Sequence, residues 1–152
     1  MVDPTQKEYE RVTELLGRPP SGKFKVVVRD NSGDPIVIRN YPVLDDGKPM
    51  PTLYWLVGEK LRSRIGTLES LGGVKAAEAE VDPNELAQAH LRYAKERDAE
   101  IPESYKGHRP SAGVGGTRKG VKCLHAHYAW FLAGGDDPVG KWVHHQLEEN
   151  NE

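Results

Sequence analysis

The residues that favour strands lie between positions 23 and 57, and most of the helical pattern comes after them. Lys23–Arg29 and Pro35–Arg39 are rich in valine and isoleucine and flank the turn-forming residues 30–34, as is typical of a β-hairpin. Residues 52–57 predict a third strand, and an isolated hairpin would be only marginally stable. This order predicts an α+β fold, with a small antiparallel sheet of about three strands packed against helices.

Helical spacing of apolar residues and capping signals predict four to five helices. The expected ranges are 5–16, 59–71, 82–100 and 137–147. A further helix is expected to start at Thr117 or Arg118 and to end at residue 133. The chain length suits one domain over residues 1–152, since no stretch is long enough to act as a linker. We expect residues 148–152 to form a frayed tail.

Membrane and secreted classes of protein fit this sequence poorly. The longest largely apolar run, residues 126–133, is far shorter than the roughly 20 residues that cross a bilayer. The first residues have no basic flank followed by an apolar stretch. Cys123 is the only cysteine, which fits a reducing compartment. We therefore expect a cytoplasmic protein with no membrane partner.

Charge is distributed unevenly along the chain. No carboxylate side chain lies between Glu103 and Asp136, and we call residues 104–135 the acid-free segment. Its cations are Lys106, Arg109, Arg118, Lys119 and Lys122. They give it a charge of +5 and leave −7 for the remainder of a chain whose net charge is −2. The segment is expected to face an anion, or else to pair with the protein's own acidic helices.

Within the acid-free segment, residues 113–120 combine glycines with cations at the expected start of a helix, and we call them the glycine-rich loop. Gly115 and Gly116 would offer backbone N–H groups, and Arg118, Lys119 and Lys122 would supply charge. The loop matches neither the P-loop nor the dinucleotide-binding pattern. We predict a binding site for a phosphate-bearing or other anionic small molecule, and the alternative is a solvated glycine-rich connection.

The next element contains one cysteine and two histidines. Cys123 and His127 are four positions apart and would share one face of a helix, whereas His125 would point elsewhere. Such a pair could hold a divalent metal, zinc or iron, with a distant histidine, or place an imidazole beside a nucleophilic thiol. Any of the three side chains could contact the anionic ligand. The alternative is that Cys123 is a small buried hydrophobe.

The preceding predicted helix carries a polar stripe. His90, Tyr93 and Arg97 follow one another at positions i, i+3 and i+7. If the stripe meets the glycine-rich loop, Arg97 becomes a further ligand-binding residue. The alternative is an ordinary surface face, since polar stripes are the norm on amphipathic helices.

Two other kinds of partner remain open at this point. The acid-free segment together with Tyr105 could form a module that binds nucleic acid or protein. The acidity of the chain as a whole argues against nonspecific nucleic-acid binding. A protein partner or a homo-oligomer, and catalytic turnover, are neither indicated nor excluded by the sequence.

Several short motifs together resemble a bacterial family, domain of unknown function 501, over residues 17–140. They are Pro51–Leu56, Tyr93 with Glu96 and Arg97, Ser111–Gly113, Gly120–His125 and Asp137–Gly140, and the Lys-Cys-Leu-His element is the most specific. The resemblance implies no established activity. It also implies one or two cysteines in the first hairpin of many members, and this chain has none there, which argues against a metal site of that composition.

Overall fold

The computed structural model describes residues 2–149, and in them it confirms the α+β class. Three strands form an antiparallel sheet in the order β1-β2-β3: β1 (Phe24–Arg29), β2 (Pro35–Asn40) and β3 (Tyr54–Leu56). The described helices are α1 (Gln6–Leu16), α2 (Glu59–Ser70), α3 (Gly73–Glu80), α4 (Pro83–Asp98), α5 (Leu124–Leu132), α6 (Pro138–Glu149) and the short 3₁₀ turn η1 (Val114–Gly116). None of these helices is long and apolar enough to cross a membrane.

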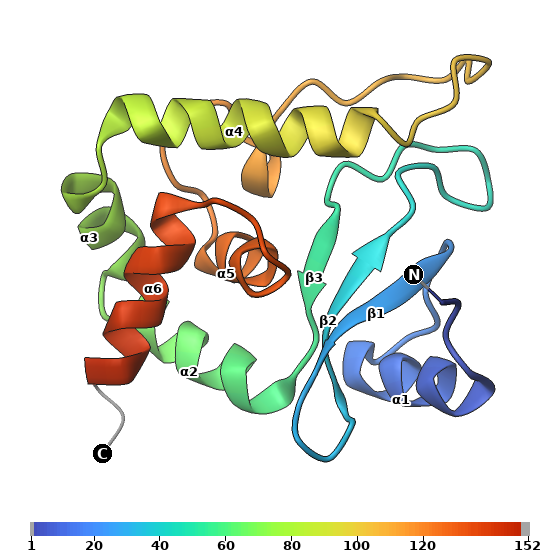
Figure 1. Cartoon of the computed structure of the whole chain (residues 1–152), viewed down its shortest axis with the longest axis horizontal. Helices are drawn as coiled ribbons and strands as arrows, with labels where there is room; N and C mark the ends of the chain where they lie inside the picture. The colour runs from blue at the N-terminus through green and yellow to red at the C-terminus, as the bar shows by residue number, and fades with distance from the viewer. Residues whose placement is uncertain (1, 150–152) are drawn as a thin grey trace.

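The sheet separates two groups of apolar side chains, because successive residues of a strand point to opposite faces. Ile38 of β2 packs with Val12 and Leu15 of α1 on one face. Val37 belongs to the larger core on the other face, to which α5 contributes Leu124 and several other residues. In Figure 1, α5 lies in the middle of the molecule, with α2, α4 and α6 around it. The sheet and helices α2, α4 and α6 thus surround α5.

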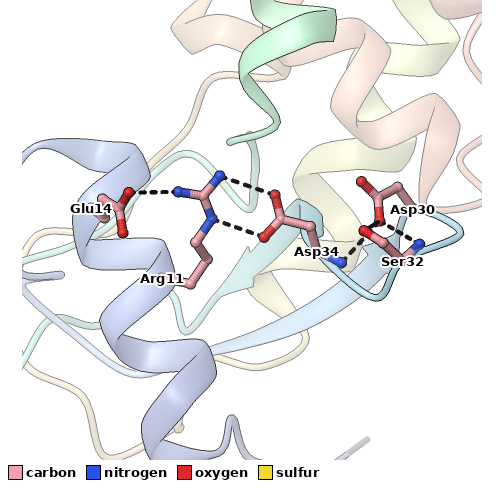
Figure 2. A network of polar contacts seen from close by, with 5 residues as sticks. All are labelled: Arg11, Glu14, Asp30, Ser32 and Asp34. Atoms are coloured by element: carbon pink, nitrogen blue, oxygen red, sulfur yellow. Dashed lines mark hydrogen bonds and ion pairs between the residues drawn. The ribbon is translucent and has the colours of Figure 1, made fainter.

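An ion-pair network ties α1 to the turn of the β1–β2 hairpin. The Arg11 guanidinium donates to both carboxylate oxygens of Asp34, at 2.8 and 3.1 Å, and to Glu14 (Figure 2). One carboxylate oxygen of Asp30 accepts the backbone N–H groups of Ser32 and Asp34. These carboxylates therefore hold the hairpin turn and its contact with α1.

The structure contains six α-helices in its described part, where four to five were expected, and α3 is the additional one. The pair Gly72-Gly73 was expected to end the helical pattern, but Gly72 only ends α2, with a φ of 88°, and α3 begins at Gly73. A Cβ at Gly73 would lie 2.6 Å from the carbonyl oxygen of Leu68. The second glycine therefore allows a close turn between two helices rather than a loop.

The expected start of the central helix at Thr117 or Arg118 is wrong, because α5 begins only at Leu124. Gly120 has a φ of 66°, and this left-handed conformation interrupts any right-handed helix that would start at Thr117 or Arg118. At the other end of the chain α6 reaches Glu149, so two residues of the expected frayed tail are helical. The remaining three, 150–152, lie outside the described residues.

The polar stripe of α4 faces the interior, so its interpretation as a surface face is wrong. His90 is 3% exposed, and Tyr93 and Arg97 are fully buried. The Arg97 guanidinium donates to the backbone carbonyls of Pro51, Pro110 and Ala112, at 3.2, 3.2 and 2.7 Å. Its Nε donates to Asp98. Arg97 therefore fixes the segment after α4 to the helix, and its bonds are to the protein itself.

Replacing Arg97 by methionine should destabilise the fold strongly, because three carbonyls lose their donor in the interior. We expect the free energy of unfolding to fall by about 3 kcal/mol or more, measured by urea denaturation. The control is Arg92→Met on the same helix, where the side chain is half-exposed and pairs with Asp136. It should lose less than about 1 kcal/mol. Equal losses in the two variants would contradict this role of Arg97.

Candidate functional site

Three potential metal-ligating side chains from two helices converge at the start of α5. Glu69 comes from the last turn of α2, Cys123 is the N-cap of α5, and His125 lies in its first turn. The Cys123 Sγ lies 3.8 Å from His125 Nδ1, and Glu69 Oε1 lies 3.2 Å from the same nitrogen. All three donor atoms are within 4.8 Å of one another, and all three residues are partly exposed. We call these residues the Glu69–Cys123–His125 cluster.

Backbone hydrogen bonding explains how the cluster forms. The Glu69 Oε2 atom accepts the N–H of Leu124 at 2.9 Å, which satisfies one of the unpaired donors at the start of α5. This bond places the other oxygen, Oε1, toward His125. Cys123 has extended backbone angles, φ −147° and ψ 120°, because it precedes the helix. Its side chain is consequently not on the helical face that an i, i+4 spacing assumes.

The orientation of the His125 ring follows from a backbone carbonyl. The Nε2 atom lies 3.2 Å from the carbonyl oxygen of Arg62, which can only accept, so Nε2 carries the hydrogen. The Nδ1 atom is then the ring nitrogen that faces Cys123 and Glu69. Metal-binding histidines are commonly oriented in this way, with one ring nitrogen donating to a carbonyl or carboxylate and the other holding the ion.

The cluster also changes the protonation of His125. Its contact with Cys123 is the largest cause that raises the pKa of the His125 imidazole, to about 9, against a lowering by burial. The charge of Glu69 and the Arg62 carbonyl raise it further. Near pH 7 the His125 imidazole is therefore protonated on both nitrogens, with its Nδ1–H facing Cys123 and Glu69.

The geometry distinguishes a metal centre from a catalytic triad. In a triad the nucleophile and the orienting carboxylate lie on opposite nitrogens of the histidine ring. Here Cys123 and Glu69 both lie on Nδ1, and the opposite nitrogen binds a backbone carbonyl. A thiol, a carboxylate oxygen and a ring nitrogen that surround one point are instead the donor set of a zinc-type ion.

Among residues 2–149, Cys123 and His127, the pair considered as metal ligands from their spacing, have no hydrogen bond to each other, and each has other partners. The potential metal-ligand group found among residues 2–149 contains Cys123 with His125 and Glu69, without His127. His127 is fully buried, and its Nδ1 lies 2.7 Å from Oδ2 of the fully buried Asp137. The other Asp137 oxygen accepts the N–H of Val139 at the start of α6. His127 Nε2 has no hydrogen-bond partner in the described structure.

His90 is a structural residue that binds the glycine-rich loop. Its Nδ1 accepts the N–H of Val114 at 3.0 Å, and its Nε2 donates to the carbonyl of Gly120 at 2.8 Å. Both ring nitrogens are thus satisfied only in the neutral form with the hydrogen on Nε2. A Cβ at Gly113 would lie 2.6 Å from this ring, so the loop packs directly on it.

The other residues of the predicted anion site lie in η1, which holds Gly115 and Gly116, and in the loop between η1 and α5. Gly115 is partly exposed, and Gly116, Arg118, Lys119 and Lys122 are exposed. Arg118 donates to the side chain and carbonyl of Ser111. Because α5 begins later than expected, these residues are not at a helix N-terminus. The N–H groups of Val121 and Leu124 lie closer to the start of α5, and they donate hydrogen bonds to the carboxylates of Glu78 and Glu69.

The sequence analysis missed Glu69, Glu78 and Asp137 as partners of the site. Glu69 and Glu78 lie far from Cys123 in sequence and sit among many other acidic helix residues, so no spacing distinguishes them. Asp137 lies directly before α6, and one of its oxygens accepts the N–H of Val139 at the start of that helix. Its second bond, to His127, had no signal in the sequence.

The chain thus combines an α+β fold with a cluster of three potential metal ligands. A family model described as a protein of unknown function, DUF501, matches residues 26–145, which is most of the chain, so the chain belongs to this family. The comparison with curated proteins found no match, and neither did the comparison with solved structures.

We expect His90 to titrate below the ordinary histidine value of 6.5, because burial lowers the pKa of its imidazole. The neutral form is favoured in the folded state, so its contribution to stability is complete above about pH 6.5 and is lost as the pH falls. Histidine ¹H–¹⁵N spectra recorded during a pH titration should show the Nε2–H tautomer at pH 7. A pKa at or above 6.5, or an Nδ1–H tautomer, would contradict the assignment.

Proposed function

We propose that this protein binds a divalent transition-metal ion through Glu69, Cys123 and His125. The observation that carries the proposal is the convergence of three donor atoms on one point. Tetrahedral zinc with ordinary bond lengths gives edges of about 3.4 Å between nitrogen and oxygen ligands and about 3.6 Å between nitrogen and sulfur ligands. The corresponding distances in the cluster are 3.2 and 3.8 Å. These two distances are close to those of a tetrahedral site, and all three donor atoms lie within 4.8 Å of one another.

The donor types favour zinc, with ferrous iron as the second choice. A thiolate excludes magnesium and calcium, which take oxygen ligands, while a mixed sulfur, nitrogen and oxygen set suits zinc. Three protein ligands leave one tetrahedral position open, as in zinc sites that bind water or substrate rather than serve only a structural role. The partial exposure of the three residues agrees with access from solvent.

The test is metal binding by protein purified without an affinity tag. Elemental analysis should find about one zinc or iron per chain, and added cobalt should give the absorption of a thiolate-bound ion. Cys123→Ser and His125→Gln should remove this absorption. Glu69→Gln should weaken metal binding by at least about 10- to 100-fold, the loss typical when even supporting residues of a metal site are changed.

Glu78→Gln is the matched control for Glu69→Gln. Each glutamate holds one backbone N–H near the start of α5, and glutamine keeps an oxygen that can accept it. Only Glu69 belongs to the cluster, so only its variant should lose metal affinity. Loss of the ion in His127→Gln but not in Glu69→Gln would assign the ion to the Cys123–His127 pair and contradict the proposal.

An anionic small molecule at the glycine-rich loop is the second candidate function. The observation in its favour is that Lys106, Arg109, Arg118, Lys119 and Lys122 are all exposed, and none forms an ion pair within residues 2–149. The alternative expectation, pairing of these cations with the chain's own acidic helices, therefore has no support in the side-chain contacts. Arg109 and Arg118 donate hydrogen bonds to neighbouring residues, but none of the five charges is neutralised by a described carboxylate, so they can attract a phosphate-bearing ligand.

A thermal-shift screen over phosphates, nucleotides and sugar phosphates tests this second candidate. A ligand that binds only the native state adds about 2.7 kcal/mol to the free energy of unfolding when its concentration is 100 times its dissociation constant. The unfolding midpoint rises as a result. The shift should be lost in Arg118→Ala or Lys119→Ala and kept in Lys7→Ala, which changes an exposed lysine of α1. If no anion raises the midpoint, the second candidate fails.

A further inference from the structure

The glycine-rich loop and the Glu69–Cys123–His125 cluster are neighbours in space. An ideal Cβ placed on Gly115 would lie 3.8 Å from the Cβ of Cys123 and 3.6 Å from that of Lys122. Gly115 and Gly116 both have positive φ values, so the chain turns sharply above these two residues. A side chain at position 115 would therefore touch Lys122 and Cys123, so the loop passes close to the N-cap residue of α5 and to the lysine before it.

Lys122 turns back toward the same loop. Its Nζ atom would lie 3.9 Å from a Cβ on Gly116, and the ammonium group forms no ion pair with a described residue. An exposed lysine without a carboxylate partner, held beside a metal ligand, is suited to contact a negatively charged molecule. Lys119 and Arg118 lie in the same loop and add further positive charge.

The charge of the filled cluster supports an anion as the fourth ligand. A divalent ion bound by one thiolate and one carboxylate forms a neutral centre, since histidine binds metal in its neutral form. Outside the centre, Lys122 adds a positive charge directly beside Cys123 in the chain, and Lys119 adds another in the same loop. The nearby carboxylate of Glu78, whose Oε2 binds the N–H of Val121, adds one negative charge. This excess of positive charge favours an oxyanion over a neutral or cationic ligand.

We infer that the open position of the proposed metal centre takes an oxyanion, with phosphate groups preferred, and that Lys122 holds the charge of that ligand. This inference rests on the proposed metal function and deepens it by naming the class of ligand. It also joins the two candidate functions in one site: the metal binds one ligand oxygen, and the loop cations bind the others.

The experiment uses full-length protein loaded with one cobalt ion and freed of excess metal. Cobalt absorption reports the number and kind of its ligands, so inorganic phosphate that binds the ion should change the spectrum with a saturable dependence on concentration. Acetate and chloride, titrated in parallel, show whether the site prefers phosphate over a carboxylate or a simple halide. Phosphate should have the lowest apparent dissociation constant of the three.

Lys122→Met should raise the apparent dissociation constant for phosphate about tenfold, as expected for the loss of one charge-assisted contact, while leaving cobalt binding unchanged. Lys7→Met is the control and should behave like the unmodified protein. A spectrum that does not respond to phosphate, or an unchanged constant in Lys122→Met, overturns the inference while the metal proposal stands. Absence of any cobalt spectrum overturns the metal proposal itself and the inference with it.

Discussion

Buried backbone groups must be hydrogen-bonded, and this requirement shapes the long segment between α4 and α5. Its only regular structure is one 3₁₀ turn, so side chains from other elements satisfy much of its backbone. Arg97 binds three carbonyls, and His90 binds one N–H and one carbonyl. Glu78 and Glu69 bind the N–H groups just before and at the start of α5. These four side chains decide where the glycine-rich loop lies and where the helix begins.

The same requirement builds the candidate metal centre. Glu69 faces His125 because its other oxygen is bound to Leu124, and His125 presents Nδ1 because its Nε2 is bound to the carbonyl of Arg62. Both orientations are set by backbone partners before any ion is present. A site prepared in this way binds an ion with little reorganisation of its ligands, which favours affinity.

Local sequence patterns predicted the secondary structure that depends on residues close together in the chain. The hairpin, the third strand and most helices follow from apolar spacing, turn residues and caps, and the structure confirms the α+β class. The predicted start of α5 was wrong because the positive φ of Gly120 and two distant glutamates decide where the helix begins. The burial of Arg97 was not predicted because its partners are backbone carbonyls. Every residue has a carbonyl, so no residue type in the sequence marks these partners. The cluster was found only in part, because Glu69 reaches it through tertiary packing.

Two separate contacts limit which residue can replace Glu69, one with Leu124 and one with His125. A replacement must offer an acceptor to Leu124 and, at the same time, a charge toward His125, and the two oxygens of one carboxylate provide both. Aspartate is one methylene shorter, and glutamine keeps the acceptor while giving up the charge. The residue at this position is therefore a marker of selection. A relative that carries glutamine here would preserve the fold alone, and one that carries glutamate would preserve the fold and the cluster together.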